Sequence, residues 1–156
     1  MEIDFLITSF VALFVIIDPI GLTPLFVALT QGMSAKARRK ITIRAIGVAF
    51  FVLMLFALFG ETVLGFVGIS MPAFRVAGGI LLFLTALDML FQRRTKRRDD
   101  QSEEEADDPS VFPLAIPLIA GPGSITTIIL IAGATPGPIG LASAGLVALA
   151  GLITVF

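Results

Sequence analysis

The sequence predicts an all-α, polytopic transmembrane helix bundle, arranged as an inverted repeat of three helices with an incomplete second copy. Hydrophobic residues make up 56% of the chain, charged residues only 15%, and the mean hydropathy is +1.00, whereas soluble domains carry about 25% charged residues. The charges are also concentrated, because residues 93–108 contain five of the 11 basic and seven of the 12 acidic residues. The remaining chain could not cover a water-exposed surface, which indicates lipid as the solvent.

Five apolar segments are each close to the roughly 20 residues that cross a bilayer. Each is expected to be a helix, because a strand exposed to lipid would leave backbone groups unpaired. The first is not expected to be a cleaved signal peptide, since Glu2 and Asp4 precede it and no Lys or Arg does. The five segments are Phe5–Leu29, Ile41–Phe59, Pro72–Phe91, Val111–Ala134 and Ile139–Phe156.

The distribution of basic residues between the segments predicts the orientation. Loop 30–40 contains four Lys or Arg residues and loop 92–110 contains five, whereas the N-terminus and the connections Gly60–Met71 and Thr135–Pro138 contain none. Basic residues in short loops remain in the cytoplasm. The N-terminus is therefore expected outside a cell inner (plasma) membrane, with both basic loops in the cytoplasm.

The stretch 92–110 changes from basic to acidic along its length. It could anchor on anionic headgroups through its basic half, but a solvated linker is the favoured interpretation, because blocks of like charge usually form such segments. The predicted organisation is a first three-helix repeat at 1–91, a charged cytoplasmic linker at 92–110 and an incomplete second repeat at 111–156.

Segments one and four contain similar interruptions. The first reads Asp18-Pro19-Ile20-Gly21-Leu22-Thr23-Pro24 and the second reads Gly121-Pro122-Gly123-Ser124-Ile125-Thr126-Thr127, so the prolines align at an offset of 103 residues. The two segments enter the membrane from opposite sides, and inverted repeats with interrupted helices are typical of secondary transporters. At the same offset a sixth helix would lie beyond Phe156, so the second repeat is expected to be incomplete.

Both interruptions are predicted to break their helices. An Asp near the middle of a span costs about 2.5–3.5 kcal/mol, and Pro19 removes a backbone donor immediately after it. Asp18 is expected to cap the second half-helix by accepting from the backbone N–H of Ile20 or Gly21. Gly121 would occupy the same position in segment four without a side-chain acceptor, leaving a positive helix end with no built-in anion.

Three motifs resemble the MarC family of bacterial and archaeal inner-membrane proteins. They are Asp18-Pro19-Ile20-Gly21, the run from Phe74 through Gly78-Gly79 to Asp88, and the run from Pro117 to Thr127. The resemblance covers essentially the whole chain. It implies six spans and a relationship to small neutral amino-acid transporters, and this chain ends after the fifth predicted span.

The asymmetry between the two interruptions suggests a site for a zwitterion such as glycine or alanine. The Gly121–Ser124 amides and the Ser124 and Thr126 hydroxyls would hold a carboxylate, while Asp18 and Thr23 would hold an ammonium group, a coupling proton or Na⁺. The predicted substrate or ion site comprises Asp18, Pro19, Gly21, Thr23, Gly121, Pro122, Gly123, Ser124 and Thr126, with Arg75 and Asp88 as secondary candidates.

Purely structural interpretations of the same residues are alternatives to this hypothesis. Asp18 could only cap its half-helix, and the glycines could only permit close helix packing. The runner-up function is accordingly a non-transporting membrane protein that aids envelope assembly or maintenance.

Other classes of function find no support. The chain has no Cys and no His, so no catalytic residue, metal site or cofactor is predicted, and the buried hydroxyls lack an activating base. The net charge of -1 argues against a nucleic-acid partner. The expected partners are the lipid bilayer and a small neutral solute, and a homo-oligomer is compatible with the sequence.

Overall fold

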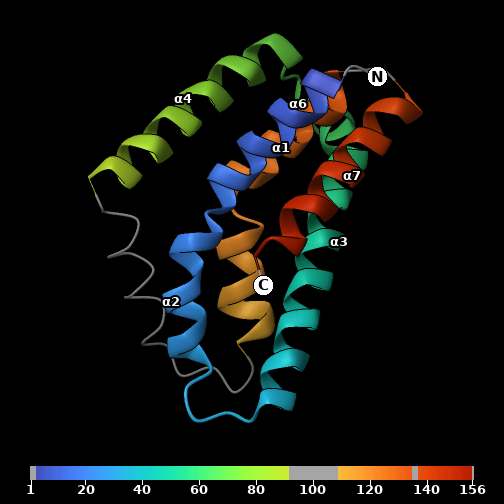
Figure 1. Cartoon of the computed structure of the whole chain (residues 1–156). Coiled ribbons are helices and arrows are strands. Elements are labelled where there is room, and N and C mark those ends of the chain that lie inside the picture. Colours follow the sequence, from blue (N-terminus) through green and yellow to red (C-terminus); the bar gives the residue numbers. More distant parts are fainter. Residues whose placement is uncertain (1–2, 92–108, 135–136, 156) are drawn as a thin grey trace.

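A computed structural model describes residues 3–91, 109–134 and 137–155 of the chain, and every regular element in these ranges is a helix. The predicted linker between Arg93 and Asp108, and Thr135 and Pro136 of the predicted turn, lie outside the described residues. The elements, shown in Figure 1, are α1 (Ile3–Ile17), α2 (Pro19–Leu29), α3 (Ala35–Val67), α4 (Met71–Leu90), η1 (Ser110–Ile119), α6 (Pro122–Ala134) and α7 (Pro138–Ile153).

The helices have the length and composition of membrane spans. Together α1 and α2 form an apolar stretch of 27 residues, α3 contains 33 residues, and α4 contributes 18 residues from Met71 to Asp88. Segments η1 and α6 are together long and apolar enough for a span but bend by 60° at the break between them, as in a broken span or a re-entrant loop. Within the described residues, three helices are therefore long enough to cross a membrane, or four when the bent pair is one span.

The fifth predicted span is shorter than expected. Helix α7 contains 16 residues and ends at Ile153, so it is about 24 Å long at 1.5 Å per residue. The hydrocarbon core is about 30 Å thick. Helix α7 is apolar but falls short of the length of a span, so the prediction that Ile139–Phe156 crosses the membrane stays a prediction.

Large apolar side chains cover the outside of the bundle. Phe66 is 93% exposed, Ile20 is 79% exposed and Phe83 is 62% exposed. Such a surface is unfavourable in water but matches the acyl chains of a bilayer. The prediction of an all-α membrane bundle is thereby confirmed.

Helix α3 extends beyond both of its predicted ends. It begins at Ala35, where the Ser34 hydroxyl accepts a hydrogen bond from the Ala37 amide (3.3 Å), so the basic residues 36–40 lie in its first turns and not in a loop. At its other end it continues to Gly68, which adopts φ 82° and stops the helix. The predicted loop Gly60–Met71 is therefore wrong, since only residues 68–70 connect α3 to α4.

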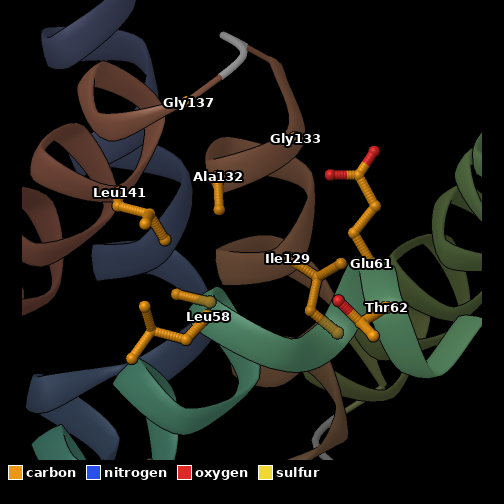
Figure 2. A pocket seen from close by; sticks show the side chains of 9 residues that line it. Leu58, Glu61, Thr62, Ile129, Ala132, Gly133, Gly137 and Leu141 are labelled. Carbon is orange, nitrogen blue, oxygen red and sulfur yellow. The ribbon is translucent and has the colours of Figure 1, made fainter.

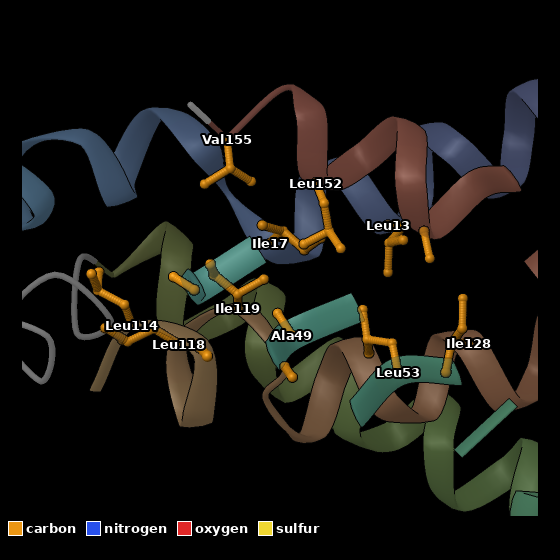
Figure 3. Close-up of a cluster of buried hydrophobic side chains, with 14 of the residues drawn as sticks. Leu13, Ile17, Ala49, Leu53, Leu114, Leu118, Ile119, Ile128, Leu152 and Val155 are labelled. Carbon is orange, nitrogen blue, oxygen red and sulfur yellow. The ribbon is translucent and has the colours of Figure 1, made fainter. Parts of the chain in front are cut away.

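Helix α3 is the centre of the packing, where η1, α6 and α7 all contact it. Its buried face repeats nearly every fourth residue and is rich in small side chains, which let neighbouring helices approach closely in a membrane. The residues of this face are Ile41, Ala45, Ala49, Leu53, Ala57 and Gly60. Figure 3 shows Ala49 and Leu53 among buried side chains from η1, α6 and α7.

The closest approach on this face predicts a packing defect. A Cβ atom on Gly60 would lie 2.6 Å from Cγ1 of Ile129 on α6, whereas one on Gly47 would meet nothing within 4 Å. We expect Gly60→Ala to lower the free energy of unfolding in detergent by about 1–3 kcal/mol, the usual cost of overpacking. Gly47→Ala on the same helix is the control and should be neutral or stabilising, since Ala favours a helix over Gly. Equal thermal stability of the two variants would contradict the packing.

Candidate functional site

Two interrupted segments run past each other in opposite directions. In Figure 1, the chain passes from α1 into α2 toward the α2–α3 connection, while η1 and α6 run back toward the end where α1 begins. Each second half begins at the expected proline: the Asp18 carbonyl accepts from the Leu22 amide (3.0 Å), and the Gly121 carbonyl accepts from the Ile125 amide (2.9 Å). The two helix starts are thus equivalent under the offset that aligns the motifs.

The first interruption is centred on Asp18. This residue adopts φ 55° and ψ 67°, the left-handed region that Asp and Asn tolerate better than most residues. Its Oδ1 atom accepts a hydrogen bond from the Gly21 amide at 3.0 Å, and Pro19 occupies the first helical position. The side chain therefore caps α2, as its position before the proline predicts.

The two interruptions differ in sharpness. Across the first, the Asp18 amide still donates to the Phe14 carbonyl at 3.0 Å, so α1 and α2 together remain one span. The second is bent by 60° at the break between η1 and α6, where Ala120 has the non-helical angles φ -88° and ψ 60°. Before this break η1 is itself irregular, since Phe112 and Ile116 have extended backbones and precede Pro113 and Pro117. A residue before proline avoids the helical conformation, which accounts for this irregularity.

The interruptions lie next to each other in the bundle. A Cβ atom on Gly123 would lie only 3.0 Å from Cγ2 of Ile16, two residues before Asp18, and 3.8 Å from Cδ2 of Leu82 on α4. The start of α6 is therefore packed between α1 and α4. Segments far apart in the chain thus place residues near the two helix starts in close contact.

The hydroxyl groups of α6 are buried at this junction. Ser124 is 2% exposed and Thr126 is 6% exposed, and the Thr126 methyl faces Gly78 of α4, where a Cβ atom would lie 2.6 Å away. The exposed Thr23 donates its hydroxyl to the Pro19 carbonyl at 3.0 Å. Thr23 can therefore still accept a hydrogen bond but already uses its own proton.

Thr127 was missed by the sequence reasoning. Its hydroxyl donates to the Gly123 carbonyl at 2.8 Å, which makes it the residue of α6 whose bonding resembles that of Thr23. The motif contains two consecutive threonines, either of which could correspond to Thr23. The offset of 103 residues aligns Thr23 with Thr126 and not with Thr127.

The two secondary candidates lie on α4, one before and one after Gly78 and Leu82, which are close to α6. Arg75 is exposed and Asp88 partly buried on α4, and their 13-residue separation corresponds to about 20 Å along a helix. Helix α4 leans away from the bundle in Figure 1 and packs mainly against α6. Within the described ranges, no group of three acidic residues could hold a metal ion.

A cavity of about 500 Å³ lies elsewhere, between α3, α6 and α7. Figure 2 shows side chains of Glu61 and Thr62 from α3 at this cavity, opposite Ala132 and Leu141. None of the sequence-predicted site residues lines it. The sequence pattern places Glu61 in a loop and gives no indication of this cavity.

Comparison with known proteins supports the family resemblance. The profile described as MarC family integral membrane protein matches residues 3–156. A UPF0056 membrane protein of Methanocaldococcus jannaschii is 47% identical over 137 residues, which is 85% of this chain and 60% of that protein. The UPF0056 membrane protein YvbG of Bacillus subtilis is 36% identical over 158 residues, which is 98% of this chain and 74% of that protein.

The matches cover a larger share of this chain than of the archaeal relatives. A UPF0056 membrane protein of Archaeoglobus fulgidus, 40% identical over 132 residues, matches 83% of this chain over 62% of its own length. The chain thus spans about 60% of the length of the archaeal relatives it matches. No solved structure matches it.

Proposed function

Because the chain belongs to the MarC family of integral membrane proteins, we propose that it acts in secondary transport of small neutral solutes such as glycine or alanine. The observation that carries the proposal is the contact between two oppositely directed, interrupted segments, where Gly123 lies against Ile16 beside Asp18. Interrupted helices meeting within a bundle are the usual substrate and ion sites of secondary transporters.

In this proposal each of the two helix starts binds one charged group of a zwitterion. The start of α6 lacks a side-chain acceptor at Gly121, so its amides and the buried Ser124 hydroxyl suit a carboxylate. Asp18 would face the ammonium group, or a coupling proton or Na⁺, while Thr23 accepts a hydrogen bond. The close packing of Gly123 against Ile16 excludes a large substrate side chain at this point.

The proposed orientation places the N-terminus outside an inner membrane and the basic first turns of α3 in the cytoplasm. The equivalent helix starts at Pro19 and Pro122 support an inverted repeat of three helices. In such a transporter, one repeat rocks against the other around the site and exposes it alternately to the two sides.

Uptake measurements test this proposal. The purified chain and, in parallel, its Bacillus subtilis relative are reconstituted in liposomes and supplied with labelled glycine, alanine or leucine, with and without proton and Na⁺ gradients. Gradient-dependent accumulation of glycine or alanine, but not leucine, by either protein is the expected result. Absence of accumulation by both proteins under every gradient would contradict the proposal.

The carboxylate subsite gives a separate prediction. We expect Ser124→Ala to raise the KM for glycine about tenfold, corresponding to about 1.4 kcal/mol, because one hydrogen bond to a charged group is lost. Ser143→Ala on α7 is the matched control: this buried serine donates to the Ile139 carbonyl (2.8 Å) and lines neither helix start. An equal rise in KM for both serine variants would show that Ser124 does not bind the substrate carboxylate.

The runner-up function, a non-transporting role in envelope assembly or maintenance, is favoured by one observation. The glycines of the second interruption are in tight contact, since a Cβ atom on Gly121 would lie 2.5 Å from the Pro117 carbonyl oxygen. Tight contacts of this kind are also those of a purely structural junction. The same uptake experiment separates the two functions.

A further inference from the structure

The cavity between α3, α6 and α7 is of a size that binds small molecules. Its volume of about 500 Å³ lies within the range of about 300–1,000 Å³ that is typical of ligand pockets. Its lining comes from α3 and, much later in the chain, from the consecutive helices α6 and α7 and the N-cap of α7. The lining residues are Ala57, Leu58, Glu61, Thr62, Ile129, Ala132, Gly133, Gly137 and Leu141.

The lining combines one acid with a majority of apolar residues. Glu61 and Thr62 supply its polar side-chain groups, whereas no lysine or arginine is among the lining residues. Figure 2 shows the Glu61 carboxylate rising from α3 beside α6, with Ile129 below it and Gly133 across from it. Such a lining suits a ligand with a single positive charge and a short apolar part.

Glu61 has no evident role in stabilising its own helix. It lies six residues before the end of α3 at Val67, outside the last turn in which a side-chain charge interacts with the helix dipole. The last turn of α3 contains no basic residue with which it could pair. Glu61 is an exposed side chain that lines the cavity.

We propose that this cavity binds a small primary ammonium ion that carries a short apolar chain. The Glu61 carboxylate accepts hydrogen bonds from the ammonium group, and the Thr62 hydroxyl accepts another. Leu58, Ile129 and Leu141 contact the apolar chain. The proposal stands apart from the transport proposal, because none of its residues belongs to the two helix starts.

Methionine resonances provide a local test. The Cε methyl of Met71 would lie 3.0 Å from a Cβ atom on Gly133, a lining residue, so ¹³C-methyl methionine labelling reports on this cavity. Met33, in the connection after α2, serves as the distant reference. Titration of the purified chain with propylammonium chloride should shift the Met71 resonance saturably and leave the Met33 resonance in place.

Two variants and one neutral analogue define the chemistry. Glu61→Gln keeps the shape of the side chain and should raise the apparent Kd for propylammonium about two- to fivefold, as expected for an exposed charge pair. Asp4→Asn, which removes an exposed acid at the start of α1, is the matched control and should leave this Kd unchanged. Propan-1-ol has nearly the same shape without the charge and should bind more weakly than propylammonium.

Each departure from this pattern overturns the proposal. An unchanged Kd in Glu61→Gln, or an equal rise in Asp4→Asn, would show that the effect is not specific to the cavity acid. Equal affinity for propan-1-ol would show an apolar site without charge recognition. Absence of a Met71 shift at saturating propylammonium would show that the cavity does not bind this cation.

Discussion

Asp18→Asn is expected to abolish gradient-driven uptake of glycine while leaving the protein folded. Asn tolerates the left-handed backbone observed at this position, φ 55°. It is also as good a helix cap as Asp, since its amide oxygen can accept from the Gly21 amide as Oδ1 does at 3.0 Å. The substitution therefore removes the charge and retains the local structure.

The size of the effect follows from the loss of a charged partner. Removing one member of a buried, hydrogen-bonded charge pair costs about 2–5 kcal/mol, so uptake at low substrate concentration should fall about a hundredfold or more. Thermal stability in detergent should be unchanged or higher, because an uncharged side chain is less costly within a membrane. Initial uptake rates and melting temperatures of the same preparations measure the two effects.

Two further variants separate capping from charge. Asp18→Gly relieves the left-handed backbone but loses the cap, whereas Asp18→Ala loses the cap and forces Ala into a conformation that costs about 1–2 kcal/mol. The expected order of stability is Asn and Asp together, then Gly, then Ala. Wild-type uptake in Asp18→Asn would leave helix capping as the whole role of this residue.

The features that the sequence predicts correctly are those decided by local chemistry. Pro19 and Pro122 begin their helices, and Asp18 caps α2, because a missing backbone donor and an adjacent acceptor act within a few residues. The membrane-bundle class follows equally from composition. Neither inference requires knowledge of which helices touch.

The features that the sequence does not predict depend on distant contacts or on helix ends. The apolar segments predict a loop at Gly60–Met71, yet α3 continues through it to Gly68. The 60° bend falls at the break between Ile119 and Pro122, and the matched motifs alone do not predict that it is sharper than the break at Asp18.

The cavity illustrates the same limit more strongly. Its acid lies on α3, its apolar wall is shared between α6 and α7, and its residues follow no common spacing in the chain. The periodicity of apolar residues describes each helix separately. It therefore identifies Glu61 as an isolated acidic residue but does not predict its neighbours on other helices. Glu61 lines a cavity only because three helices pack around it.

The second large effect is expected from Gly121→Ala, which should destabilise the junction of η1 and α6 more than any other single-methyl addition considered. A Cβ atom at Gly121 would lie 2.5 Å from the carbonyl oxygen of Pro117 and 3.9 Å from that of Leu118. Both neighbours are backbone atoms within a buried segment, so relief requires movement of the chain itself. Gly60 differs in this respect, because its close neighbour is the Ile129 side chain, which can change conformation.

We therefore expect a cost of about 3 kcal/mol or more for Gly121→Ala, at or above the upper end of ordinary overpacking. Gly79→Ala is the control, since a Cβ atom there meets nothing within 4 Å and a helical Ala is more stable than Gly. Thermal unfolding in detergent, followed by size-exclusion chromatography, should give a melting temperature lower by about 5–10 °C for Gly121→Ala alone. A melting temperature equal to that of Gly79→Ala would mean that Gly121 is not confined by the Pro117 carbonyl. The bare start of α6, on which the carboxylate subsite depends, would then have no steric requirement for glycine at this position.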